Sequence, residues 1–390
     1  MRPEIALAER RQCVRDAAAG WRRAGAVDET ARAAIDRAYA DDRSRLGPVF
    51  RVLVFGFTFV AVTAFLGLVG LVAQAGGGGL LLFLAIPLVI ATELQLGPLR
   101  RRQAGAESAT AFLSACFALG GSIWLLLETL RLPEQASINL ALVLTTLVFG
   151  AAALRWGYTV FALVAAVAAY LLLARCPLAR WLWIAIPVLT VVPLLRLADS
   201  VRLAPSHRRS SEAVALASLV FLYLAVHVGS WDRRVVEMVA TEGRELPPVA
   251  SPLRPLFVIA TGALPLLVVC WGIAARRRSL LDLGLAGVLA SLMTLRFYVH
   301  LAPLWVVLVL GGSAAIGLAL LLRRYLDSDP GHERHGFTAE PLFVDPRRRS
   351  ALEVAVSVVA LGPAARPAEK PGGFEAGGGG FGGGGASGEY

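Results

Sequence analysis

The longest apolar stretch of the chain is the feature that most limits how it can fold. Residues 52–99 contain a single charged side chain, that of Glu93. A water-soluble domain has no use for so long an apolar run, whereas a bilayer needs about 20 apolar residues for every helix that crosses it. Hydrophobic residues make up 56% of the chain and charged residues 17%, against about 45–50% and about 25% in soluble domains. The sequence therefore predicts an all-α polytopic membrane protein.

The basic residues are almost all arginine. The chain has a formal net charge of +10, and of its 38 basic residues only Lys370 is lysine. This bias indicates a GC-rich bacterial genome and hence a bacterial cytoplasmic (inner) membrane. Arginines that flank membrane spans meet anionic lipid on the cytoplasmic side, which explains the charge better than nucleic-acid binding does. We therefore predict the lipid bilayer as a partner and exclude nucleic acid.

Residues 49–322 form the predicted transmembrane domain. Charges, prolines and glycines divide it into about ten apolar segments of 17–22 residues, close to the length that crosses about 30 Å of hydrocarbon. The division between the fifth and sixth segments depends on the very short turn from Arg175 to Arg180. The predicted spans are 52–73, 79–97, 109–130, 137–154, 158–174, 179–196, 212–231, 255–275, 279–298 and 302–322.

The distribution of arginine predicts that both ends of the chain lie in the cytoplasm. Eleven arginines fall in the first 51 residues, and Arg323 and Arg324 directly follow the last predicted span. The loops between spans divide less clearly, with eleven arginines on the predicted inner side and eight on the outer side. An even number of spans agrees with the positively charged flanks at both ends.

Residues 1–48 precede the first span and are predicted to form a short cytoplasmic helical hairpin. Gly25 suits the end of its first helix, and Asp28 suits the N-cap of its second. Apolar residues recur on one face of each helix. So short a segment buries little surface by itself, so we predict that it packs on a protein partner, on a second copy of the chain or on the membrane. The apolar faces comprise Ile5, Val14, Ala17, Ala18 and Trp21, and then Ala31, Ala34, Ile35, Ala38 and Tyr39.

The residues after the last span form two predicted regions. Residues 323–371 are a cytoplasmic segment in which 351–361 is almost wholly apolar. That stretch is too short to span, so it either lies on the inner leaflet beside Arg347–Arg349 or docks on protein. Residues 372–390 contain eleven glycines and are predicted to be a disordered tail, because they cannot bury enough surface to offset the entropy of ordering.

Ionisable residues inside membrane spans are the usual mark of a functional site in such proteins. Those of this chain lie near predicted span ends, where they can reach interfacial water: Glu93, Glu128, His227, Asp282 and Arg296. Glu93 lies four to five residues inside the second span, next to Thr92 and close to Gln95. Thr92, Glu93 and Gln95 are therefore the candidate intramembrane polar site, where a carboxylate could coordinate a cation or relay a proton.

The sequence contains no motif that recommends an enzyme. Gly331–His335 (GHERH) lacks the HExxH spacing that places two imidazoles on one helical face, and the four cysteines form no CxxC pair. Phosphate-binding loops and the GxSxG nucleophile motif are also missing from the sequence. We therefore predict no catalytic residue, no cofactor and no metal.

Two parts of the chain resemble known bacterial proteins. The first resemblance is carried by Trp21, Gly25, Val27, Asp28, Ile35, Tyr39 and Arg43. On these residues, the stretch 10–75 resembles a family of predicted membrane proteins in which an N-terminal domain of unknown function, a helical hairpin, precedes many spans. The glycine-rich tail is similar to those of some bacterial envelope proteins, although the small phosphatase-like domain that some of them carry is missing here. Neither resemblance implies catalytic residues.

Two functions fit these observations. The first is a non-enzymatic envelope protein that binds a partner, and the alternative is a small-molecule or ion transporter or channel built from kinked spans. The surroundings of Glu93 distinguish them, because a polar group of another span across a water-accessible cavity would favour transport. Contact with lipid headgroups would favour partner binding. The residues that can kink spans are Pro87, Pro187, Pro193, Pro265, Gly120–Gly121 and Gly311–Gly312.

Overall fold

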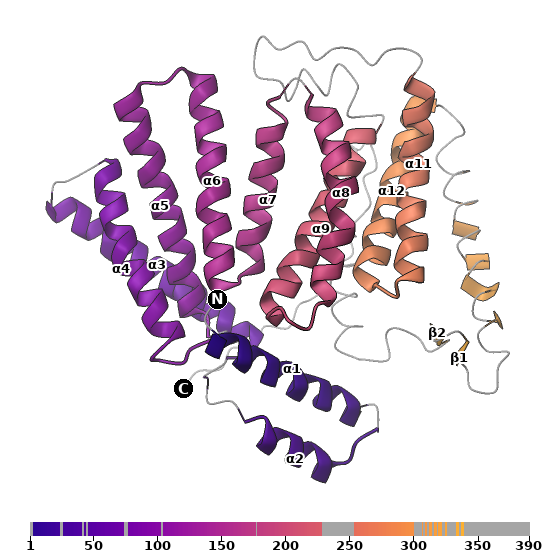
Figure 1. The fold of residues 1–390 in the computed structure, drawn as a ribbon, viewed down its shortest axis with the longest axis horizontal. Helices are drawn as coiled ribbons and strands as arrows, with labels where there is room; N and C mark the ends of the chain where they lie inside the picture. The colour runs from indigo at the N-terminus through magenta and orange to yellow at the C-terminus, as the bar shows by residue number, and fades with distance from the viewer. Residues whose placement is uncertain are drawn as a thin grey trace, which may run out of the picture. The chain divides into compact units, whose positions relative to one another are not determined.

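The computed structural model of the chain is helical (Figure 1). It describes residues 3–23, 26–40, 43, 46–73, 77–102, 104–176, 178–227 and 253–299, and scattered positions between 306 and 338. The chain divides into two units, residues 1–303 and 304–390. Helices α1 to α9, α11 and α12 belong to the first unit, and the second contains two antiparallel two-residue strands, β1 (Glu333–Arg334) and β2 (Phe337–Thr338).

Two polar helices begin the chain. They are α1 (Pro3–Arg23) and α2 (Glu29–Ala38). Asp28 is the N-cap of α2, as its position in the sequence predicts, because its carboxylate accepts the Ala31 backbone N–H at 2.8 Å. Ion pairs between the two helices hold them together, including Arg15–Asp36 at 3.3 Å.

The helices that follow are apolar. Seven in the described part of the chain are long and apolar enough to cross a membrane, which is consistent with a multi-pass membrane protein. These seven are α3 (Pro48–Ala73), α4 (Gly78–Leu96), α5 (Ala106–Leu130), α6 (Glu134–Trp156), α8 (Ala179–Asp199), α9 (Pro205–Val226) and α11 (Arg254–Ala274). Two more apolar helices are α7 (Thr159–Leu173) and α12 (Arg278–Val299).

The predicted number of about ten spans is not confirmed. A helix lies at each of the first nine predicted spans, and α7 and α8 divide where expected. However, α7 has only 15 residues, so it extends about 22 Å. This length is shorter than a hydrocarbon core, which is about 30 Å thick. α12 is also not among the seven candidates. The tenth predicted span is described only at scattered positions, and residues 351–361 and 372–390 lie outside the described part.

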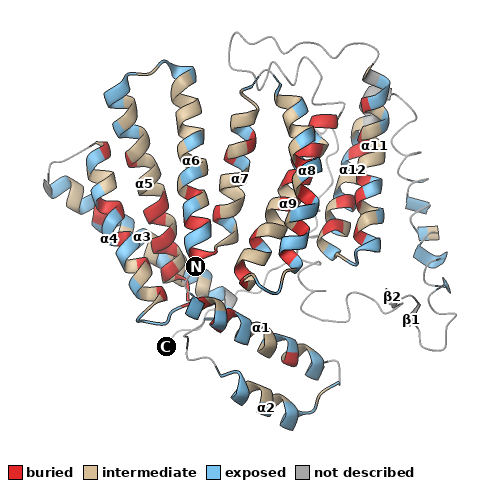
Figure 2. Ribbon diagram, in the orientation of Figure 1, coloured by how far each residue is buried: buried red, intermediate tan, exposed pale blue. Residues whose placement is uncertain are grey.

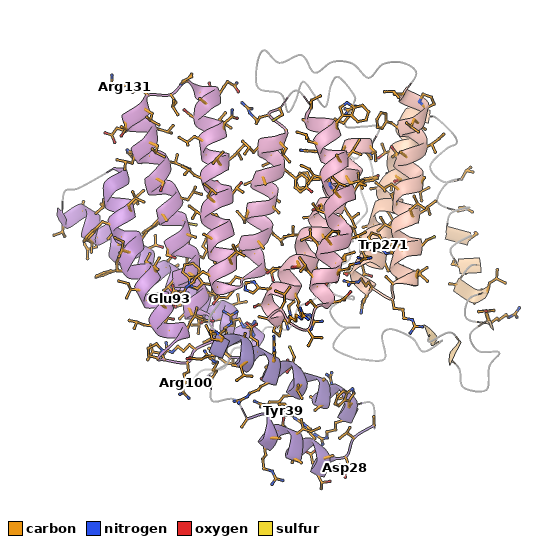
Figure 3. All side chains as sticks on the ribbon, in the orientation of Figure 1. Asp28, Tyr39, Glu93, Arg100, Arg131 and Trp271 are labelled. Carbon is orange, nitrogen blue, oxygen red and sulfur yellow. The ribbon has the colours of Figure 1, made fainter. Side chains whose placement is uncertain are left out.

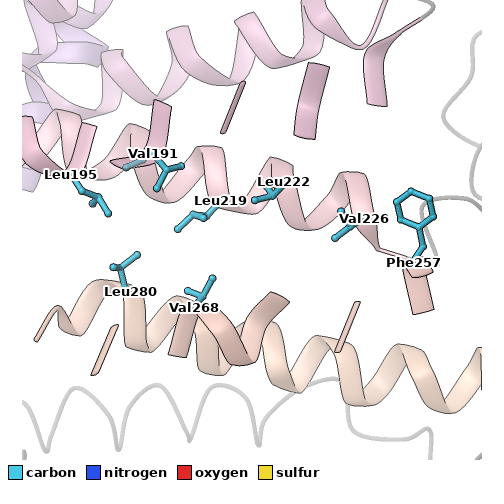
Figure 4. Close-up of a cluster of buried hydrophobic side chains, with 9 residues drawn as sticks. Val191, Leu195, Leu219, Leu222, Val226, Phe257, Val268 and Leu280 are labelled. Atoms are coloured by element: carbon cyan, nitrogen blue, oxygen red, sulfur yellow. The ribbon is translucent and has the colours of Figure 1, made fainter. Parts of the chain in front are cut away.

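Helices adjacent in sequence pack side by side. The closest pairs are α4 with α5, α6 with α7, α8 with α9 and α11 with α12. α9 joins several of these pairs because it also contacts α7, α11 and α12. Its contacts with α8 and the α11–α12 pair form a cluster of buried side chains that includes Leu219, Leu222 and Leu280 (Figure 4).

Burial is distributed unevenly along the first helices (Figure 2). Only 6% of the apolar window of α3 is buried, as expected for a helix whose sides face lipid. In contrast, the first half of α5 is largely buried, and its buried residues include Glu107, Thr110 and Ser114 among alanines. Polar side chains are thus buried close to where α1 contacts the other helices.

Candidate functional site

Two of the three predicted site residues lie together between α4 and α5. Thr92 is fully buried near the end of α4, and its hydroxyl lies 2.8 Å from the Leu88 carbonyl and 2.9 Å from the Thr110 hydroxyl. Gln95 Nε2 reaches the same Thr110 oxygen at 3.4 Å. Thr110 is a residue that the sequence did not single out, and it is the centre of this small hydrogen-bonded group.

Glu93, the third predicted residue, lies near the end of α4 (Figure 3) and pairs instead with the end of α6. Its two carboxylate oxygens accept hydrogen bonds from Arg155 Nε at 2.8 Å and Nη2 at 2.9 Å. The Trp156 indole N–H donates to Oε1 at 3.0 Å. The Glu93 side chain is 20% exposed and that of Arg155 is 52% exposed, so this ion pair lies at the edge of the apolar region.

A second ion pair, which the sequence analysis missed, is almost fully buried. Glu9 of α1 accepts hydrogen bonds through Oε1 from Arg102 Nε at 3.1 Å and Nη2 at 2.5 Å. Its Oε2 accepts the backbone N–H of Ser206 at 3.1 Å. Arg102 also donates to the Trp156 carbonyl at 3.1 Å, and only 3% of Arg102 and 8% of Glu9 are exposed.

The electrostatic surroundings match these charges. Ser206 lies in the first turn of α9, where free N–H groups and the helix dipole favour a carboxylate. Burial lowers the pKa of Arg102, but Tyr158, Glu9 and Glu107 raise it more strongly, so the pKa lies above its ordinary value. Arg102 therefore stays charged, 4.9 Å from the centre of the Tyr158 ring.

A second buried carboxylate, Glu107, belongs to the same group. Its Oε1 accepts the Ala104 backbone N–H at 3.0 Å, whereas its Oε2 is buried and makes no hydrogen bond within the described part of the chain. Gly105 positions it, because Gly105 has a left-handed backbone with φ of 100°. A Cβ atom there would lie 2.5 Å from the Arg51 carbonyl oxygen, so only glycine lets α3 approach the start of α5 this closely.

Together these contacts fix α1 to three other segments. Arg102 lies between α4 and α5, the Trp156 carbonyl lies at the end of α6, and Ser206 lies at the start of α9. Arg10 adds a hydrogen bond to the Arg202 carbonyl at 2.8 Å. Glu9 could have been noticed because it follows Ile5 by four residues, on the apolar face of α1. The sequence did not distinguish Arg102 as a buried residue, because it is one of three consecutive arginines.

A different polar group joins α9, α11 and α12. The Tyr223 hydroxyl lies 2.9 Å from the Ser291 hydroxyl, which also lies 2.6 Å from the Thr261 carbonyl oxygen. His227 Nε2 lies 2.9 Å from the Thr294 hydroxyl. His227, a residue that the sequence marked, therefore has a neutral partner on α12.

Two cavities lie away from the predicted site residues. One, of about 200 Å³, lies between α9, α11 and α12 and is lined almost entirely by apolar atoms, with Tyr223 and Pro265 among its residues. The other, of about 420 Å³, adjoins Gly120, Trp124 and Glu128 on α5. Glu93 thus contacts polar groups of another helix directly and not across either cavity.

Nothing in the described residues indicates a metal site, since no three His, Cys, Asp or Glu side chains are grouped to hold an ion. Comparison with known proteins adds no further information: no family model, curated protein or solved structure matches the chain. The resemblance of residues 10–75 to a bacterial membrane-protein family therefore stays a prediction.

Proposed function

We propose that the chain is an integral protein of a bacterial cytoplasmic membrane that binds another protein, or a second copy of itself, through α1 and α2. It performs no catalysis in this proposal. The supporting observation is that the buried charges attach α1 to the other helices and do not line either cavity. Glu9, Arg102 and the start of α9 fix α1 in place, and none of these residues lines either cavity.

The exposed surface of α1 and α2 suits a protein partner. α2 has no buried residue. Trp21 and Tyr39 are half exposed, 50% and 42% respectively, and exposed aromatic residues of this kind are enriched at protein interfaces. Fixing α1 by a buried ion pair presents this surface in a defined position, which reduces the entropy lost on binding.

The arginines near α1 support a cytoplasmic location for α1 and α2. The segments that α1 contacts contain Arg100–Arg102 at one place and Arg202, Arg208 and Arg209 at another, and such residues concentrate on the cytoplasmic side. We propose about ten spans in total, with α7, α12 and residues 302–322 added to the seven candidates. Reporter fusions after Arg102, Arg209 and Arg278 should then report the cytoplasm, and one at Gly77 the outside.

The second candidate function is transport of a small molecule or ion. The observation that favours it is the cavity beside Pro265, because a proline inside α11 can break its hydrogen-bond ladder near a ligand. The almost wholly apolar lining provides little to bind a polar solute. An ion-linked transport function that uses Glu93 requires Glu93→Gln to abolish the activity, whereas the partner-binding function requires no effect of this variant on complex formation.

Site-specific photo-crosslinking in intact cells tests the proposal. A photo-reactive residue at Tyr39 should form one discrete adduct, whose mass distinguishes a second copy of the chain from another protein. The matched control is Leu130, which is 51% exposed at the last residue of α5 and should crosslink only to lipid. No protein adduct at Tyr39, or equal protein adducts at both positions, would contradict the proposal.

A further inference from the structure

Arg102 has two buried carboxylates as neighbours, and they come from different parts of the chain. Glu9 belongs to α1 and makes two hydrogen bonds to the guanidinium. Glu107 lies five residues after Arg102, in the first turn of α5. Both acidic residues are buried, Glu9 at 8% and Glu107 at 0% exposure.

We propose that α1 is a releasable latch, and that Arg102 exchanges the Glu9 carboxylate for that of Glu107 when α1 leaves the other helices. Two discrete pairings of one arginine then define a docked and an undocked state. This inference does not depend on what α1 and α2 bind.

The free oxygen of Glu107 is the first argument for this exchange. Glu107 Oε2 is buried without a hydrogen-bond partner among the described residues, and a buried unsatisfied carboxylate oxygen is costly. Native proteins rarely keep such an oxygen without a reason. It supplies an acceptor that becomes useful once Glu9 has gone, because a buried guanidinium without a carboxylate is strongly destabilising.

The charge and the position of Glu107 also suit the exchange. The charge of Glu107 is close enough to raise the pKa of Arg102. The other Glu107 oxygen accepts the Ala104 N–H, which keeps the carboxylate beside the segment that carries Arg102. The exchange therefore uses a carboxylate that lies only five residues from Arg102 along the chain.

The modest burial of α1 makes release feasible. Besides Glu9, only Ile5, Ala8 and Ala18 of α1 are buried. Apolar burial contributes about 25 cal/mol for each Å², so three side chains of which two are alanines add little. The ion pair of Glu9 with Arg102 and the N–H of Ser206 are thus the main specific attachments of α1.

Carboxylate-to-amide substitutions test the latch in the full-length protein, in detergent or nanodiscs. Glu9→Gln should increase amide hydrogen exchange in residues 3–23 at least tenfold. It should leave α5, α6 and the part of α9 after its first turn unchanged, since only the Ser206 N–H of α9 donates to Glu9 among the described contacts. Its melting temperature should fall only slightly, because Glu107 then pairs with Arg102. Glu107→Gln alone should leave α1 as protected as in the wild type.

The double variant Glu9→Gln/Glu107→Gln should lose far more thermal stability than the sum of the two single variants, because Arg102 then has no carboxylate. If it fails to accumulate, adding Arg102→Met should restore folding, since no buried charge remains. Glu4→Gln is the matched control, since Glu4 itself is exposed in the first turn of α1.

Three results would overturn the latch. One is unchanged exchange of α1 in Glu9→Gln. Another is a full loss of stability from Glu9→Gln alone, with no further effect of Glu107→Gln in that background. The third is failure of Arg102→Met to restore folding of the double variant.

Discussion

The group of residues around α1 and the group formed by α9, α11 and α12 are stabilised in opposite ways. Around α1, charged side chains join the segments: Glu9 with Arg102, and Glu93 with Arg155. Between α9, α11 and α12, the contacts within the helices are neutral, as in the pair of hydroxyls from Tyr223 and Ser291. A carboxylate takes part only near the start of α12 among the contacts of the described residues, where Ser279 donates to Glu212 of α9. The charged contacts lie at helix ends and the neutral ones within helices, which follows the cost of placing a charge in hydrocarbon.

Backbone proximity takes the place of charge in the second group. A Cβ atom on Gly284 would lie 2.7 Å from Val269 Cγ2 and 2.8 Å from Val269 N, and one on Gly272 would lie 2.7 Å from Leu281 N. Membrane helices gain no hydrophobic driving force from contact with each other, so small residues that permit close approach stabilise their association. Four predictions separate the two modes of attachment, beginning with the largest expected effect.

Gly284→Ala should destabilise the protein by about 1–3 kcal/mol, because the new methyl group forces α11 and α12 apart. Gly150→Ala is the matched control inside α6, where the nearest atom to a new Cβ is 4.0 Å away. That control should be neutral or slightly stabilising, because alanine favours helix over glycine. Thermal unfolding of both variants in the same detergent measures the difference. Equal shifts would show that backbone proximity does not hold α11 against α12.

Tyr223→Phe should cost less, about 0.6 kcal/mol, the average for a hydrogen bond between membrane helices. The Ser291 hydroxyl keeps its contact with the Thr261 carbonyl, so no buried group is left without a partner. Thermal unfolding, again in the same detergent, measures the effect. Trp183→Phe provides a comparison, because it also removes one hydrogen bond between two helices: the Trp183 indole N–H of α8 donates to the Tyr170 carbonyl of α7. A loss above about 2 kcal/mol for Tyr223→Phe would mean that this hydroxyl pair is worth more than an average hydrogen bond between membrane helices.

The sequence predicted the helices better than the contacts between them. Apolar runs and their interruptions located α3 to α9, α11 and α12 because each helix is specified by its own residues. Asp28 was predicted as an N-cap for the same local reason. The pairing of Glu9 with Arg102 joins residues that are distant in sequence, and no local pattern encodes it. Glu93 was located correctly near a helix end, but its partners Arg155 and Trp156 depend on how α4 lies against α6.

Glu93→Gln should change stability by less than about 1 kcal/mol, since ion pairs that reach water contribute little. Glutamine still offers one oxygen to Arg155 and Trp156. Thermal unfolding at low and high salt should show the small difference from the wild type shrinking as salt rises, because ions screen exposed pairs. Glu93→Leu serves as the comparison variant. A large loss with leucine but not with glutamine would mean that the Trp156 hydrogen bond, and not the charge, is what matters at this position.

Asp28 should produce the smallest effect, confined to α2 and to acidic pH. The Thr30 hydroxyl at 2.6 Å and the Ala31 N–H at 2.8 Å both donate to its carboxylate and lower its pKa below the ordinary value. A pKa that is lower in the folded than in the unfolded state stabilises the fold above the unfolded pKa, and this contribution disappears as the pH falls through the folded pKa. Asp28→Asn keeps a good capping residue that does not titrate. Hydrogen exchange in residues 29–38, compared at equal pH so that intrinsic rates cancel, should match between wild type and variant at neutral pH. The wild type should then exchange faster below about pH 4, while α4 to α9 stay alike in both proteins, and a difference that persists at neutral pH would mean that Asp28 acts through more than its cap.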